Sequence, residues 1–105
     1  MRRAMVRYRV KPDRADENVE LIRAVYDEIA ETKPEGFRYA TLRLDDGVSF
    51  VHLYEGEAEV SGLSEIAAFK AFQAEIADRC EEGPVATGAD VIGSYGFGYS
   101  VDQAP

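Results

Sequence analysis

Five side chains in the sequence have the chemistry to bind or activate a small polar molecule: Arg7, Tyr39, Thr41, His52 and Tyr54. Arginine and tyrosine bind anionic or phenolic groups, and the imidazole of His52 can accept a proton near neutral pH. Tyrosine and arginine are also enriched in buried protein interfaces that perform no chemistry. The residue types therefore favour a ligand pocket or an interface, and in an interface His52 makes a structural hydrogen bond to Thr41.

A β-hairpin is predicted to bring four of these residues together. The segments 37–44 and 48–55 flank Asp45-Asp46-Gly47, and an Asp-Gly pair is typical of a two-residue hairpin turn. With Asp46-Gly47 as the loop, Thr41 lies opposite His52 and Tyr39 lies opposite Tyr54. The other face of this hairpin is aliphatic and carries Ala40, Leu42, Val51 and Leu53.

The segments around the hairpin complete a recognisable order of elements. Strands are indicated by alternating side chains, and helices by apolar residues that repeat with a period of about 3.6. The predicted elements are a strand over 3–10, a helix from Asp13 to about Thr32, the hairpin, a helix from Ser64 to Gly83-Pro84, and a strand over 85–97. This βαββαβ order predicts an α+β, ferredoxin-like sandwich, with two helices on one face of a four-stranded, mainly antiparallel sheet.

The two faces of this sheet are assigned by the pattern of apolar residues. The helices are expected to cover Ala4, Val6, Tyr8 and Val10 together with the aliphatic face of the hairpin. The open face then carries Met5, Arg7, Arg9 and the aromatic face of the hairpin. In this fold the first and third strands are central neighbours, so Arg7 or Arg9 is expected beside His52. The alternation leaves the facing of the last strand undecided.

The aromatic side chains on the predicted open face need a partner. An exposed apolar patch on a monomer rarely exceeds a few hundred Å². A second copy of the sheet related by two-fold symmetry covers such a patch most simply. We therefore expect a homodimer in which Tyr39, Phe50 and Tyr54 are buried against the symmetry mate.

Composition excludes several classes of protein. The 105 residues carry a net charge of −8, which argues against nucleic-acid binding, and form one predicted domain over 1–105 with a core over 3–97 and a tail over 98–105. No apolar run reaches the roughly 18 residues of a membrane span, and the N-terminus lacks the apolar stretch of a signal peptide. A single cysteine fits a reducing cytoplasm, and one histidine without CxxC or HExxH predicts no metal site.

The segments FRYATL (37–42), SFVHL (49–53) and AFKAF (68–72), with the order of elements, resemble the antibiotic-biosynthesis-monooxygenase-like group of dimeric α/β barrels. The resemblance covers about residues 3–97. It implies two sheets packed face to face, a lumen for a small aromatic or quinol-like substrate, and use of oxygen without a metal, flavin or other cofactor. Haem-degrading relatives fit poorly, because the chain has no tryptophan and its one histidine lies on a predicted strand.

The leading hypothesis is therefore a homodimeric, cofactor-independent monooxygenase that acts on or binds a small aromatic compound. The alternatives are a non-catalytic ligand-binding or regulatory module of the same fold, and an isomerase or lyase that uses His52 as its base. In each case we expect a planar phenolic or anionic ligand among Arg7, Tyr39, Thr41, His52 and Tyr54. A nearby arginine would lower the pKa of His52 and keep its imidazole neutral.

Overall fold

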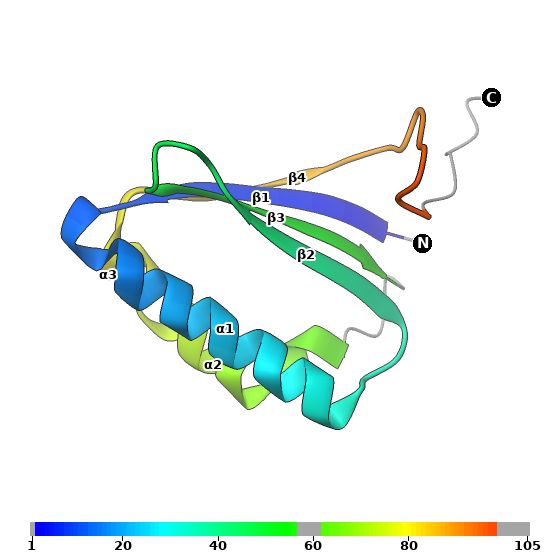
Figure 1. Ribbon diagram of the computed structural model, residues 1–105, viewed down its shortest axis with the longest axis horizontal. Coiled ribbons are helices and arrows are strands. Elements are labelled where there is room, and N and C mark those ends of the chain that lie inside the picture. Colours follow the sequence, from blue (N-terminus) through cyan, green and yellow to red (C-terminus); the bar gives the residue numbers. More distant parts are fainter. Residues whose placement is uncertain (1, 57–61, 99–105) are drawn as a thin grey trace.

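The computed structural model describes residues 2–56 and 62–98, so most of the predicted tail lies outside the described residues. Its elements are β1 (Arg2–Val10), a 3₁₀ turn η1 (Pro12–Arg14), α1 (Ala15–Thr32), β2 (Phe37–Arg43), β3 (Ser49–Gly56), a second 3₁₀ turn η2 (Gly62–Glu65), α2 (Ala67–Ala74), α3 (Ile76–Arg79) and β4 (Cys80–Gly88). The antiparallel sheet has the order β2-β3-β1-β4, and the helices lie on one of its faces (Figure 1). The predicted α+β, ferredoxin-like fold is confirmed.

The predicted register of the β2-β3 hairpin is confirmed, although the turn is built differently. Thr41 pairs with His52 and Tyr39 pairs with Tyr54. The turn is closed by the amide of Gly47, which donates to the carbonyl of Leu44 at 2.9 Å. A two-residue Asp46-Gly47 loop is therefore wrong, and the strands are joined by a longer loop with the same centre. The Asp46 carboxylate holds this loop by accepting from the amides of Val48 and Ser49 and from the Ser49 hydroxyl, at 2.9, 2.8 and 2.6 Å.

The predicted facing of the hairpin is wrong, and its two faces are exchanged. Val6 pairs with His52 and Tyr8 pairs with Phe50, so these residues share the face that packs on the helices. Phe50 is only 1% exposed, and it stacks on Tyr8 with ring centroids 5.5 Å apart. The aliphatic side of the hairpin, with Leu42 49% exposed, lies on the open face instead.

Packing explains why the aromatic face points inward. The helix α2 is short and approaches the sheet through Phe72, which lies near the rings of both Tyr8 and His52. Large rings from the sheet fill this space, as close packing of a protein interior requires. The polar atoms of these rings bond to one another, which removes most of the cost of burying them.

The C-terminal third differs most from its prediction. The expected second helix is divided into η2, α2 and α3, and β4 begins already at Cys80. Gly83 and Pro84 lie within β4 rather than before it, because β4 is an edge strand where a missing amide hydrogen is tolerated. The facing of β4 is now defined, since Ala86 pairs with Val6 on the helix side.

A side chain of α1 fixes the start of α2. The Glu28 carboxylate accepts hydrogen bonds from the amides of Ala67 at 3.1 Å and Ala68 at 3.0 Å. These amides belong to the first turn of α2, where no backbone acceptor is available within the helix. The contact therefore positions α2, and with it Phe72, over the sheet.

Replacing Gly47 by valine should lower the free energy of unfolding by about 1–2 kcal/mol, because Gly47 has a φ of +78° that a β-branched residue resists. Urea denaturation measures the change. Gly83→Val is the matched control, since an added Cβ at Gly83 meets no atom within 4 Å and its φ is not in the left-handed region. Equal losses in both variants would contradict the role given to the Gly47 conformation.

Candidate functional site

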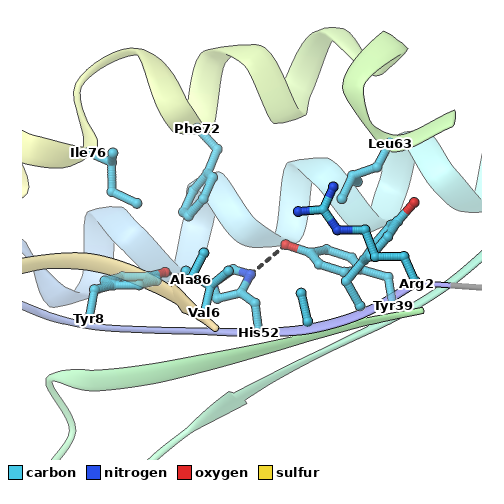
Figure 2. A pocket seen from close by; sticks show the side chains of 11 residues that line it. Arg2, Val6, Tyr8, Tyr39, His52, Leu63, Phe72, Ile76 and Ala86 are labelled. Atoms are coloured by element: carbon cyan, nitrogen blue, oxygen red, sulfur yellow. Dashed lines mark hydrogen bonds between the residues drawn. The ribbon is translucent and has the colours of Figure 1, made fainter. Parts of the chain in front are cut away.

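A cavity of about 280 Å³ lies between the sheet and the helices. Its walls come from β1, β2, β3, β4, η2, α2 and α3, and most of its lining side chains are apolar or aromatic. They are Arg2, Ala4, Val6, Tyr8, Tyr39, His52, Tyr54, Leu63, Phe72, Ile76 and Ala86. Figure 2 shows Tyr39 and His52 on the sheet side, with Phe72 and Ile76 facing them from the helices. We call this cavity the central pocket.

His52 is the polar centre of the central pocket. Its side chain is 4% exposed, and both ring nitrogens have hydrogen-bond partners. Nε2 lies 2.8 Å from the Tyr8 hydroxyl, while Nδ1 lies 2.5 Å from the Tyr39 hydroxyl and 3.2 Å from Oγ1 of Thr41. The imidazole is therefore held in one orientation between two phenols.

The network continues from Tyr8 to buried side chains of α1 and α3. The side-chain amide nitrogen of Asn18 donates to the Tyr8 hydroxyl at 3.0 Å, and Nε of Arg79 donates to the Asn18 oxygen at 3.1 Å. Asn18 and Arg79 are 0% and 1% exposed. The Arg79 guanidinium also donates to the carbonyl of Phe72 at 2.6 Å and lies over the Phe72 ring. These contacts make a continuous buried line from Arg79 to Tyr39.

Thr41 connects the network to α1 by a shorter branch. Its hydroxyl lies 2.8 Å from the hydroxyl of Tyr26, whose ring stacks on Tyr39 with centroids 5.5 Å apart. Tyr39 thus has an aromatic neighbour on one side and His52 on the other. This packing fixes its hydroxyl at the edge of the central pocket.

Burial determines the protonation of the site. Desolvation lowers the pKa of His52 from its ordinary value of 6.5 to about 4, so the imidazole is neutral near pH 7. Desolvation also raises the pKa of Tyr8 and of Tyr39, so both phenols keep their protons. The lowered pKa of His52 was expected, but its cause is burial rather than a neighbouring arginine.

The structure brings together four of the five residues proposed from the sequence. Tyr39, His52 and Tyr54 line the central pocket, and Thr41 contacts His52 directly. The fifth residue, Arg7, pairs with Val51 and lies exposed on the opposite face of the sheet. Its expected position beside His52 is wrong, because the hairpin faces are exchanged and Val6 takes that place. The arginine that reaches the central pocket is Arg2.

Two buried residues of the network were missed by the sequence analysis. Asn18 occupies a position of the apolar stripe of α1, where Ala15, Ile22 and Val25 are its buried neighbours at helical spacing. A polar residue in such a stripe is a detectable signal, since buried amides require partners. Arg79 has no comparable local signal, because it follows the exposed residues Ala77 and Asp78 in a helix of only four residues.

Within residues 2–56 and 62–98, no three His, Cys, Asp or Glu side chains gather in an arrangement that could hold a metal ion. In the same part of the chain, no helix has the length and hydropathy needed to cross a membrane.

The fold and the central pocket define a ferredoxin-like α+β protein with a small aromatic cavity between its sheet and helices. This fold is shared with solved structures, which agrees with the resemblance seen in the sequence. A Nitrosomonas europaea protein provisionally named an antibiotic biosynthesis monooxygenase is 23% identical, with a TM-score of 0.68 over 94% of this chain and 100% of that chain.

Other solved structures share this fold, and their names are not all the same. A Caulobacter crescentus protein, also provisionally named an antibiotic biosynthesis monooxygenase, is 19% identical, with a TM-score of 0.65 over 88% of this chain and 90% of that one. A Burkholderia xenovorans NIPSNAP domain protein is 17% identical, with a TM-score of 0.55 over 95% and 100% of the two chains. No protein-family model and no curated protein matches the sequence. The similarity therefore establishes the fold.

The stability of the protein should fall as the pH decreases from about 6.5 to about 4, because the unfolded state binds a proton at His52 that the folded state excludes. The His52 contribution is fully present above pH 6.5 and amounts to about 3 kcal/mol over this range. The measurement is the free energy of unfolding of the natural chain and of His52→Gln between pH 7 and pH 4. The difference in the free energy of unfolding between the natural chain and His52→Gln should shrink as the pH falls. A proton NMR titration of the single histidine with a midpoint near 6.5 would contradict this account.

Proposed function

We propose that this protein binds a small planar phenol or hydroquinone in the central pocket and oxidises it with molecular oxygen, as a cofactor-independent monooxygenase. The observation that carries the proposal is the pairing of Tyr39 and His52 at the wall of a cavity of about 280 Å³ that is otherwise lined mostly by aliphatic and aromatic side chains. Cavities for drug-sized ligands span roughly 300–1,000 Å³ and combine apolar walls with a few polar groups. The central pocket suits one or two fused rings.

The polar groups of the central pocket match a ligand with oxygen substituents. The Tyr39 hydroxyl is placed to contact a ligand oxygen, with the neutral imidazole of His52 behind it. Arg2 lines the pocket from the first residue of β1, and its guanidinium favours a ligand that becomes anionic. When a hydroquinone reacts with oxygen, one oxygen atom enters the ring and the other leaves as water, while the hydroquinone itself supplies the electrons.

A non-catalytic ligand-binding module is the second candidate. Both nitrogens of His52 are already bonded to phenols of the protein, which is typical of a structural histidine. An isomerase or lyase would need His52 as a base. Its pKa of about 4 makes His52 a weak base near neutral pH, where the most effective general bases titrate.

We also propose that the protein is a homodimer through the open face of the sheet, with a changed set of contacts. The open face displays Met5 at 38%, Leu42 at 49% and Val85 at 65% exposure. The segment after β4 carries Ile92, Tyr95 and Phe97 at 91%, 96% and 72% exposure. Its end is held near β2, where Arg38 donates to the carbonyls of Phe97 and Gly98. A second copy would cover these apolar groups, whereas Tyr39, Phe50 and Tyr54 belong to the helix side.

Oxygen consumption with a panel of small hydroquinones tests the proposed reaction, after the uncatalysed rate has been subtracted. Tyr39→Phe should lower kcat/KM at least about tenfold, because it removes the hydroxyl that contacts the ligand. Tyr95→Phe is the matched control, since it makes the same change on a side chain that does not line the central pocket. Binding without oxygen consumption would favour the ligand-binding module, and equal rates for both variants would contradict the site.

Light scattering at micromolar concentration should return twice the mass of the chain. A dimer that is stable at this concentration is expected to bury more than about 1,000 Å² in total. Leu42→Glu should produce monomers by placing a charge in that interface. Ala24→Glu, on the exposed side of α1, adds the same charge outside it and should remain dimeric. Phe50→Asp is not a suitable probe of this interface, because Phe50 is buried under the helices and its loss should unfold the chain. A monomeric natural chain would refute the dimer.

A further inference from the structure

The hydrogen bonds along the buried line from Arg79 to Tyr39 have a fixed direction of donation, which is set at the Arg79 end. A guanidinium has only hydrogen-bond donors, so the atom of Asn18 that Arg79 contacts must be its carbonyl oxygen. The amide nitrogen of Asn18 therefore faces Tyr8 and donates to its hydroxyl oxygen. The orientation of this amide is therefore determined by Arg79.

The donor from Asn18 sets the role of the next hydroxyl. Once the Tyr8 oxygen accepts from Asn18, its own hydrogen is free to be donated to Nε2 of His52 at 2.8 Å. A neutral imidazole whose Nε2 accepts must carry its hydrogen on Nδ1. That hydrogen is donated to the Tyr39 oxygen at 2.5 Å, with Thr41 as a weaker second acceptor at 3.2 Å. The reverse arrangement leaves the buried Tyr8 hydrogen without an acceptor among the contacts of the described residues.

We propose that Asn18, oriented by the buried Arg79, is a positioning residue that fixes the Nδ1–H form of His52 and turns the hydroxyl hydrogen of Tyr39 into the central pocket. The pocket then presents a hydrogen-bond donor to its ligand. This polarity selects a ligand whose oxygen accepts, such as a phenolate or a quinone carbonyl, over one that donates. The inference rests on the proposed function in taking the central pocket as the ligand site.

The substitution Asn18→Asp is expected to reverse the direction of hydrogen-bond donation between residue 18 and Tyr39, with almost no change in side-chain shape. An aspartate oxygen would accept the Tyr8 hydrogen, and the Tyr8 oxygen would then accept from Nε2 of His52. Nδ1 would become the acceptor and would take the Tyr39 hydrogen, leaving only lone pairs toward the pocket. Arg79 would gain an ionic partner, and its charge offsets part of the cost of burying the new carboxylate.

Nitrogen-15 NMR of the ligand-free protein at pH 8 reads the tautomer directly, since the chain has a single histidine. We expect the Nδ1–H form in the natural chain and the Nε2–H form in Asn18→Asp. Tyr8→Phe, which removes the donor to Nε2 but keeps Asn18, should lose the preference for Nδ1–H. Gln73→Glu makes the same amide-to-carboxylate change on an exposed residue of α2 and should keep the natural tautomer. An Nε2–H histidine in the natural chain, or an unchanged tautomer in Asn18→Asp, would overturn the inference.

Binding of 4-nitrophenol tests the polarity at the ligand, because its neutral and anionic forms absorb at different wavelengths. The bound phenolate should be favoured about tenfold more in the natural chain than in Asn18→Asp, since a hydrogen bond to a charged group is among the stronger ones. An identical preference in both proteins would overturn the role given to Tyr39. Failure of the probe to bind either protein would count against the proposed function, while the tautomer result would stand on its own.

Discussion

The antiparallel pairing of β1 with β3 is the constraint on which the rest of the molecule depends. It sets Val6 opposite His52 and Tyr8 opposite Phe50, so the aromatic side of the hairpin faces the helices. A slip of one residue would turn His52 to the open face and separate it from Tyr8. The central pocket, the hydrogen-bonded line and the exposed aliphatic face all follow from this one register.

Much of the fold could be predicted because its signals are local. The alternation around the Asp-Gly pair was enough to align Thr41 with His52, and the helix before Pro34 ends at Thr32 as its period indicated. Which side of the hairpin faces inward is not a local property. The aliphatic side looked like the core because its side chains have no polar atoms. The aromatic side is buried instead, since its hydroxyls and imidazole bond to one another.

The candidate site was predictable only where residue type was informative. Tyr39, His52 and Tyr54 were proposed for their chemistry, and the hairpin brings them to one cavity. Arg7 was placed there by the same wrong choice of face that misplaced the hairpin. Arg79 was not predictable, because its burial depends on the carbonyl of Phe72 and the amide of Asn18.

The contact between Asn18 and Arg79 joins residues 61 positions apart in the chain. Closing a loop of that length costs conformational entropy and is a slow step compared with forming a hairpin or a helical turn. A nascent chain that has emerged from the ribosome only as far as α2 already contains Tyr39, His52 and Asn18, but not the guanidinium that orients the amide. The aromatic side chains of the sheet can therefore pack during synthesis. The direction of their hydrogen bonds is fixed only after Arg79, in the last quarter of the protein, has been made.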